Sequence, residues 1–398
     1  MVAEVQKTFR CPGCLGRDVF VFFENHHAPV FCNVLWEDRQ AAIASPRAAI
    51  RLGFCPRCQL IYNVDFDASL LDYSKQYENS LHYSNHFQKY AEDLACRLVK
   101  RHHLYNKDVI EIGCGQGDFL ALLASAGENR GVGFDPSFDL TRASTTTQRL
   151  VKVVPEFYSV DHAEYPADII CCRQVLEHVI SPLKFLKSIR KLIGERCETI
   201  VFFEVPNAMY TLRDKGIWDI IYEHCSYFTP QSLTNLFFRA GFEVMEVGEQ
   251  YGGQFITLEA RPARVKRKTP SNIKWITGEP ANLIDEFRRI YHEKTSQWNL
   301  LLANLKKQYH RIAIWGAGSK GITFLNTLNI SHKTVPYVVD VNPFKHGRYL
   351  TGMGQKIVPP IFLQQYIPQA LILMNPIYQE EIRETMRKLD LNAEILLA

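Results

Sequence analysis

Short apolar runs alternate with amphipathic stretches between residues 107 and 260. Each run has the length of a buried strand, and each stretch has the spacing of a helix that packs on a sheet. This alternation predicts an α/β fold with a doubly wound parallel sheet. The expected strands are Val109–Ile112, Gly131–Phe134, Val151–Val154, Ile169–Cys172, Thr199–Glu204, Phe242–Glu246 and Phe255–Ala260.

The same alternation restarts near the C-terminus, where residues 311–398 predict a second, Rossmann-like βαβ unit. Its expected strands are Arg311–Trp315, Val335–Asp340, Ala370–Met374 and Ala393–Leu397. A basic stretch and one long amphipathic helix, Pro280–Gln308, occupy residues 261–310 between the two units. We interpret the basic stretch as a solvated linker rather than a polybasic binding patch.

The N-terminal part differs in pattern, and two segments are expected there. Residues 8–65 are rich in short strand-like runs and turns, whereas residues 66–106 form an aromatic connector that becomes helical from Asn85. A chain of 398 residues is too long for one ordinary core, which agrees with several domains.

Composition narrows the functional classes. The net charge of +4 is small for this length and argues against an extended nucleic-acid-binding face. No apolar run approaches a membrane span, and the polar N-terminus lacks the apolar core of a signal peptide. Eleven cysteines without such a signal indicate a reducing compartment, so we expect a cytoplasmic protein.

Two Cys-x-x-Cys pairs lie near the N-terminus, Cys11 with Cys14 and Cys55 with Cys58. Together they supply four thiolates, the ligand set of a tetrahedral structural Zn²⁺ site. The alternative is a pair of redox-active or incidental motifs, but a thioredoxin-type pair needs a βαβ context that this region lacks. Cys32, between the pairs, is expected in the core.

A glycine-rich turn follows the strand at 109–112 and leads into a helix. Its glycines are Gly113, Gly115 and Gly117, with Glu111 inside the preceding strand and Asp135 at the end of the next one. The spacing G-x-G-x-G differs from the G-x-G-x-x-G of pyrophosphate binders. It resembles motif I of class I S-adenosylmethionine (SAM) methyltransferases, in which these residues bind the cofactor. A purely structural turn is the alternative.

The strand at 169–172 runs into a polar turn that carries Gln174, Glu177 and His178. In methyltransferases of this class the corresponding strand ends beside the methyl donor. The resemblance therefore implies that Gln174 borders the cofactor and that His178 is a candidate catalytic residue. Equally, Glu177 and His178 can serve only to orient the turn.

The segment 218–228 places Tyr222, Glu223 and His224 side by side on a predicted loop. Carboxylate, imidazole and phenol together are expected of an acid–base site, and His224 is the natural proton acceptor near neutral pH. The alternative for His224 is a structural loop histidine bonded to a backbone carbonyl.

A second glycine-rich turn, Gly316-Ala317-Gly318-Ser319-Lys320-Gly321, fits G-x-G-x-x-G, and Asp340 follows it. Taken alone, this pattern predicts a dinucleotide site. Lys320 inside the turn also suits a phosphate of the substrate, because a helix N-terminus binds diphosphate with or without a nicotinamide. A vestigial Rossmann domain is the remaining interpretation.

These parts, in this order, resemble the sugar C-methyltransferase family: a zinc-binding domain, a SAM-binding core and a C-terminal Rossmann-like domain. The resemblance implies C-methylation beside the keto group of a nucleotide-linked deoxysugar, through an enolate. It matches the family's loop tyrosine, glutamate and histidine to Tyr222, Glu223 and His224, with the histidine as base, and a linker tyrosine to Tyr77. It also implies a small-molecule partner. The oligomeric state stays open, with a monomer plausible.

One departure concerns the residues after the loop. Family members often carry Gly-Gly-Ser-x-Arg, whereas this chain reads Gly252-Gly253-Gln254-Phe255-Ile256. The change leaves the acceptor sugar and the methylated atom open, and an O-methyltransferase is one alternative. A nicotinamide-dependent oxidoreductase that uses the 316–321 turn and a non-catalytic zinc scaffold are the others.

Overall fold

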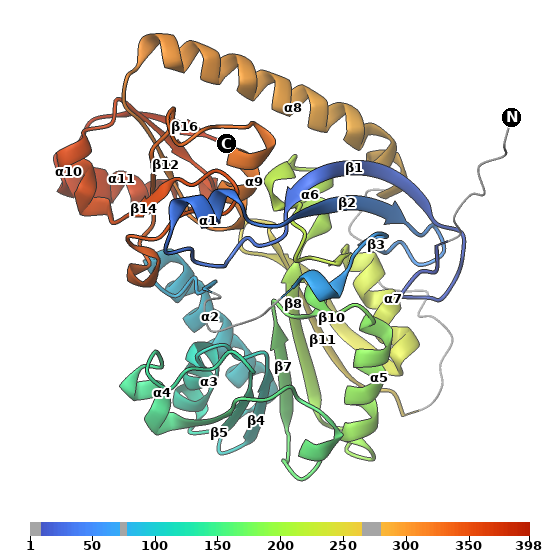
Figure 1. Ribbon diagram of the computed structural model, residues 1–398. Coiled ribbons are helices and arrows are strands. Elements are labelled where there is room, and N and C mark those ends of the chain that lie inside the picture. Colours follow the sequence, from blue (N-terminus) through green and yellow to red (C-terminus); the bar gives the residue numbers. More distant parts are fainter. Residues whose placement is uncertain (1–8, 72–77, 265–279) are drawn as a thin grey trace, which may run out of the picture.

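The computed structural model describes residues 9–71, 78–264 and 280–398. Three β-sheets organise them: a seven-stranded sheet, a five-stranded sheet and a four-stranded sheet. In Figure 1 the seven-stranded sheet lies below, the C-terminal sheet lies above it, and the N-terminal sheet lies beside both. The predicted α/β fold with a doubly wound parallel sheet is confirmed.

The seven-stranded sheet has the order β10-β11-β8-β7-β4-β5-β6. Its strands from β4 to β8 are parallel, and β10 and β11 close one edge antiparallel. The strands are β4 (Asp108–Ile112), β5 (Arg130–Phe134), β6 (Val151–Val154), β7 (Ile169–Arg173), β8 (Ile200–Pro206), β10 (Phe242–Gln250) and β11 (Phe255–Pro262). Each overlaps a predicted strand, although β10 runs four residues and β11 two residues beyond the predicted end.

Alternate residues of the central strands face opposite layers of helices, as the two-residue period of a strand requires. Ile110 and Ile170 share a core with helices α5 and α7, whereas Val109 and Ile169 share another with α2 and α3. The helices are α2 (Asn85–His102), α3 (Asp118–Gly127), α4 (Thr145–Leu150), α5 (Pro182–Ile193), α6 (Ala208–Leu212) and α7 (Pro230–Ala240).

The four-stranded sheet, in the order β1-β2-β3-β9, takes its last strand from a distant part of the chain. Its elements are β1 (Phe20–Pro29), α1 (Arg39–Ile43), β2 (Arg47–Phe54), β3 (Ile61–Asn63) and β9 (Ser226–Tyr227). In the register, Ile61 pairs with Tyr227, and Tyr62 pairs with Ser226. The predicted loop at 218–228 is therefore fixed to the N-terminal sheet.

The five-stranded C-terminal sheet is entirely parallel, in the order β14-β13-β12-β15-β16. Its elements are β12 (Ile312–Trp315), α9 (Ser319–Thr327), β13 (Tyr337–Val339), β14 (Lys356–Val358), α10 (Leu363–Tyr366), β15 (Ala370–Leu373), α11 (Gln379–Lys388) and β16 (Glu394–Leu397). The predicted strands are present, and β14 is an addition.

Helix α8 (Pro280–Gln308) matches its predicted bounds and joins the C-terminal sheet to the N-terminal one (Figure 1). Phe287 on α8 packs edge-on against Phe23 of β1, with ring centroids 5.6 Å apart. Farther along α8, Trp298 meets Phe324 of α9 at 5.0 Å. These contacts belong to one apolar core that spans both sheets, so burial of aromatic surface holds them together.

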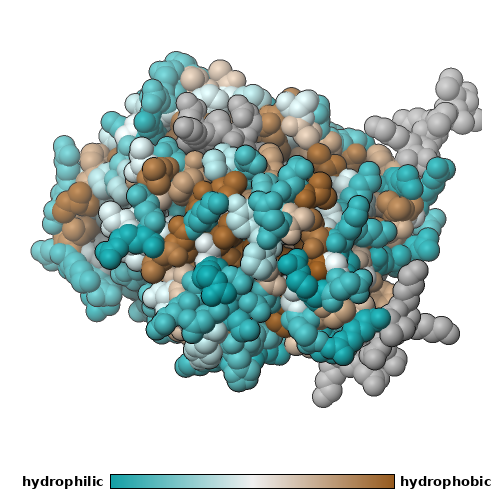
Figure 2. All heavy atoms as spheres, turned by 90° about the horizontal axis from the view of Figure 1, so that it is seen from below, coloured by the Kyte–Doolittle hydropathy of each residue, from teal (hydrophilic) through white to brown (hydrophobic). Residues whose placement is uncertain are grey.

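On the face seen in Figure 2, apolar residues form a band of small patches between hydrophilic ones. Such a mixture is ordinary for a globular protein surface. Among the described residues, no helix combines the length and apolarity needed to cross a membrane.

Candidate active site

The first glycine-rich turn connects β4 to α3 and is shaped by Gly113. Its backbone lies in the left-handed region, with φ of +68°, and a Cβ there would stand 2.2 Å from Cγ2 of Val175. The next glycine, Gly115, donates its N–H to Oδ2 of Asp135 at 2.8 Å, which ties the turn to the end of β5. A Cβ at Gly115 would meet nothing within 4 Å, so the turn borders open space where a ligand can lie.

Glu111 lies beneath this turn and is almost completely buried. Burial raises the pKa of its carboxyl group to about 8, and its Oε2 has no hydrogen-bond partner. A buried carboxyl oxygen without a partner beside a glycine cradle is unusual in a purely structural turn. The predicted cofactor residues Glu111, Gly113, Gly115, Gly117 and Asp135 therefore lie together around the end of β4.

A polar network that the sequence analysis missed lies at the ends of β7 and β8. Glu204 is fully buried and accepts hydrogen bonds from Arg173 and Gln174, at 2.9 and 3.2 Å. Tyr90 of α2 donates to the same carboxylate. Arg173 also lies over the ring of Phe119, 4.0 Å from its centroid. The network holds Gln174, whose φ of +55° is left-handed, in place.

A cavity of about 290 Å³ lies where the connector, the seven-stranded sheet and the C-terminal sheet meet. Three of the predicted site residues line it: Gln174, His178 and His224. The second glycine-rich turn lines the opposite wall, through Gly316, Gly318, Ser319, Lys320 and Gly321. The cavity is thus bounded by both units that the sequence predicts to bind ligands.

Tyr222, Glu223 and His224 do not converge, although they are adjacent in sequence. The Tyr222 hydroxyl accepts from Asp67 N–H at 2.8 Å, and its ring stacks on Phe66. Glu223 accepts from the N–H of Cys32 at 2.8 Å and from Nδ2 of Asn33 at 3.0 Å. These two side chains anchor the loop to the N-terminal region, and only His224 lines the cavity.

His178 and His224 face each other across the cavity wall, with ring centroids 5.0 Å apart. His178 donates through Nδ1 to the backbone carbonyl of Glu223 at 2.9 Å. Burial lowers the pKa of His178 to about 4. Burial, aided by His178 and Lys320, also lowers the pKa of His224 well below its ordinary value. Both imidazoles are consequently neutral at physiological pH.

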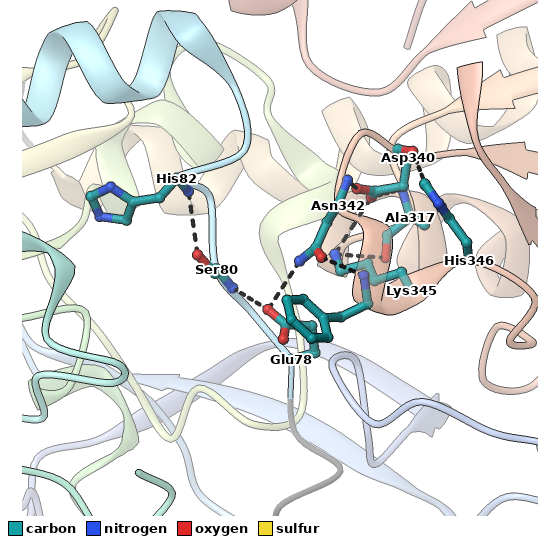
Figure 3. Close-up of polar contacts among 9 residues, drawn as sticks. Glu78, Ser80, His82, Ala317, Asp340, Asn342, Lys345 and His346 are labelled. Carbon is teal, nitrogen blue, oxygen red and sulfur yellow. Dashed lines mark hydrogen bonds and ion pairs between the residues drawn. The ribbon is translucent and has the colours of Figure 1, made fainter. Parts of the chain in front are cut away.

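The second glycine-rich turn has the tight packing that its motif requires. A Cβ at Gly321 would stand 2.1 Å from the carbonyl oxygen of Gly316. Asp340 accepts from Ala317 N–H at 3.0 Å, and the buried ammonium of Lys345 lies 3.4 Å from the same carboxylate (Figure 3). Lys320 forms an ion pair with Asp219, a neighbour of the His224 loop.

Residues 79–81, 83 and 84 of the connector line the cavity. Glu78 is buried, accepts from Asn342 Nδ2 at 3.0 Å (Figure 3), and forms an ion pair with Arg142 of the seven-stranded unit. Farther along, Ser84 donates to Glu381 of α11 at 2.6 Å. Tyr77, the linker tyrosine of the expected site, lies outside the described residues.

Gln254, the residue at the departure from the family pattern, also lines the cavity. It exchanges two hydrogen bonds with Asn375, both 2.9 Å long, and so links β11 to the C-terminal sheet. A carboxamide pair of this kind is neutral. It therefore brings no positive charge to this wall of the cavity.

The four predicted zinc ligands, Cys11, Cys14, Cys55 and Cys58, form one buried group. Sulfur separations are 3.4 Å for Cys11–Cys58 and 3.5 Å for Cys14–Cys55. A tetrahedral zinc site with Zn–S bonds near 2.3 Å places its sulfurs about 3.8 Å apart. The group can therefore hold a metal ion with little rearrangement.

Two family models match the chain. Residues 85–247 match a methyltransferase domain, and residues 250–395 match the C-methyltransferase C-terminal domain. The first covers the seven-stranded unit from α2 to most of β10, and the second runs from the last residue of β10 through β11 and α8 into the C-terminal sheet.

Individual proteins that resemble this chain share a quarter to a third of its residues in the matched parts. C-methyltransferase NovU of Streptomyces niveus is 26% identical over 288 residues, which is 69% of this chain and 67% of NovU. A tRNA U34 carboxymethyltransferase of Sulfurimonas denitrificans is 30% identical over 48% of this chain and 63% of its own length. Among solved structures, the dimethyltransferase RosA of Streptomyces davawensis is 22% identical, with a TM-score of 0.36, over 44% of this chain and 55% of RosA.

Proposed function

Because the chain belongs to a family of SAM-dependent C-methyltransferases, we propose that it methylates a carbon atom beside the keto group of a nucleotide-linked deoxysugar. The observation that carries this proposal is the position of His224. Its imidazole lines a cavity that also borders Gln174 and the glycine-rich turn of the C-terminal sheet. Of the residues that we assign to the donor, Gln174 lines this cavity and the glycine-rich turn after β4 does not. We therefore propose that the base and the acceptor share the cavity and that the donor methyl group reaches it beside Gln174.

In the proposed reaction, the neutral imidazole of His224 removes a proton from the carbon next to the carbonyl group. The resulting enolate carbon would be the nucleophile that a bound SAM methylates, with neutral S-adenosylhomocysteine as the leaving group. When bound, SAM supplies an electrophilic methyl group on its sulfonium. We assign cofactor binding to Glu111, Gly113, Gly115, Gly117, Asp135 and Gln174.

The surrounding residues have supporting roles. Tyr222 and Glu223 hold the loop, and His178 orients it through the carbonyl of Glu223. Lys320, at the N-terminus of α9, is suited to a substrate phosphate because the free N–H groups and the ammonium favour an anion. A phosphate there would compete with Asp219 for Lys320.

A nicotinamide-dependent oxidoreductase is less well supported by the C-terminal turn. The carboxylate of Asp340 would have to accept the ribose hydroxyl groups. It already has the buried ammonium of Lys345 beside it, whereas the hydrogen bonds to Asp135 come from neutral groups of Gly115 and Ser137. Calorimetric titration with SAM and with NAD(P) distinguishes the two functions.

We also propose that Cys11, Cys14, Cys55 and Cys58 hold a structural Zn²⁺. Four thiolates leave no position open for substrate, so the metal would stabilise the fold and take no part in the reaction. The β3 strand, which pairs with β9 beside His224, begins three residues after Cys58. Metal binding would thereby help to fix the loop.

The proposal is tested by mass spectrometry of keto-sugar nucleotides incubated with SAM and the protein. We expect a gain of one methyl group, with loss of deuterium from a substrate labelled at the carbon beside the keto group. Methylation with full retention of that deuterium would instead indicate an oxygen acceptor. His224→Ala, with SAM affinity measured in parallel, serves as the catalytic control.

A further inference from the structure

Glu177, His178 and His224 form a second cluster of metal-ligating groups, separate from the four cysteines. One ligand atom from each lies within 4.8 Å of the other two. All three residues line the cavity, so an ion held among them would be open to solvent and substrate on one side. Two imidazoles and one carboxylate are a common three-residue ligand set for zinc and related divalent ions.

The buried carboxylate of Glu177 is the strongest evidence that a cation binds here. Its side chain is 2% exposed, and its Oε2 has no hydrogen-bond partner. Its other oxygen, Oε1, lies 3.9 Å from Nε2 of His178. A buried carboxylate oxygen without a partner is costly, and a cation between Glu177 and the two imidazoles would satisfy it.

His178 is already oriented as a metal ligand requires. The carbonyl oxygen of Glu223 can only accept, so Nδ1 of His178 carries the proton and Nε2 carries the lone pair. Metal-binding histidines usually donate their second nitrogen to a carbonyl or carboxylate in this way. The bond therefore directs Nε2 toward Glu177.

We propose that Glu177, His178 and His224 form a three-ligand site for a divalent transition-metal ion, and that binding of this ion excludes His224 from proton abstraction. An imidazole whose lone pair is bound to a metal cannot accept a proton from the substrate. The exclusion of His224 rests on the proposed function, whereas the existence of the metal site does not. The ion and the acceptor sugar would then compete for the same cavity.

The test of binding is metal stoichiometry, measured on the full chain after dialysis against micromolar Zn²⁺. We expect two equivalents in the wild type, and one in Glu177→Gln and in His178→Ala, whose remaining equivalent reports an intact cysteine site. His292→Gln, at an exposed position on α8, is the matched control and should keep two. One equivalent in the wild type, or two in both cavity variants, would overturn the site.

To test whether the bound ion prevents His224 from abstracting the proton, methyl transfer is measured at rising Zn²⁺ concentration. We expect inhibition that is competitive with the keto-sugar, and that weakens at least tenfold in Glu177→Gln. If methyl transfer is unchanged or faster when two Zn²⁺ ions are bound per chain, the ion does not exclude His224 from the reaction. If no keto-sugar is methylated at all, the proposed function fails, yet the stoichiometry still decides whether the metal site exists.

Discussion

His178 donates a hydrogen bond through Nδ1 to the backbone carbonyl of Glu223, at 2.9 Å. The bond joins the turn after β7 to the residue immediately before His224. The sequence alone leaves open whether His224 is a structural histidine bonded to a backbone carbonyl. In the structure it is His178 that donates to a backbone carbonyl. The loop that carries His224 is held by the hydrogen bonds of Tyr222 and Glu223.

Glu223→Gln should lower kcat while leaving SAM affinity within about twofold. Two partners of the carboxylate, Cys32 N–H and Asn33 Nδ2, are donors. The amide NH₂ of glutamine would face one of them and leave a buried donor unsatisfied, at a cost of about 1–3 kcal/mol. Steady-state kinetics and calorimetry measure the two effects. An exposed control, Glu198→Gln, should change neither, and parallel loss of SAM binding in Glu223→Gln would contradict the account.

Cys55→Ser should release the proposed zinc and reduce methyl transfer together. The cysteine site precedes β3, and β3 pairs with β9 next to His224, so loss of the metal should loosen the loop. Metal content by mass spectrometry and turnover of the same sample provide the readout. Cys197→Ser, outside the cluster and partly exposed, should retain both properties. Full activity in a metal-free Cys55→Ser protein would refute this coupling.

We expect Gly113→Ala mainly to lose stability and Gly115→Ala mainly to lose SAM affinity. Both positions have positive φ, but only a Cβ at Gly113 collides with another side chain, that of Val175. We expect Gly113→Ala to lose about 2–4 kcal/mol of stability and Gly115→Ala about 1 kcal/mol. Gly115→Ala should instead weaken SAM binding, because its Cβ enters the open space. Denaturant unfolding and calorimetry distinguish these outcomes, and identical behaviour of both variants would argue against the predicted cradle.

Stability should fall with rising pH through the titration of Glu111. Burial raises the pKa of Glu111 from an ordinary 4.5 to about 8, so the folded state binds its proton more tightly than the unfolded state. Its contribution is complete below about pH 4.5 and is lost as the pH rises through about 8. Urea unfolding at pH 6 and pH 9 should therefore show a smaller loss in Glu111→Gln than in the wild type. An equal loss in both proteins would mean that Glu111 is not protonated when folded.

The sequence predicts the elements well and their long-range relationships poorly. Helix α8 and the strands around motif I follow from periodicity, since each is a local pattern. β14 and β9 have three and two residues, too few for a period, and their pairing depends on distant chain segments. The sequence alone therefore gives no sign that β9 completes the N-terminal sheet.

The candidate site shows the same limit. Adjacency of Tyr222, Glu223 and His224 suggested one catalytic group, but neighbouring side chains on an extended loop point in different directions. The Arg173–Glu204–Gln174 network was also missed, because Glu204 is 31 and 30 residues from these two partners and lies in an otherwise apolar strand. An arginine beside Gln174 at the end of a buried strand was the signal available, since a buried charge needs a partner.

The central claim is that His224 removes a proton from the acceptor. Exchange in D₂O tests it without methyl transfer: the protein is incubated with a keto-sugar nucleotide and S-adenosylhomocysteine, the demethylated form of the donor, and the sugar is analysed by NMR. We predict deuterium uptake at the carbon beside the keto group with the wild type, and a loss of at least a hundredfold in His224→Ala. Equal exchange by the two proteins would contradict the claim.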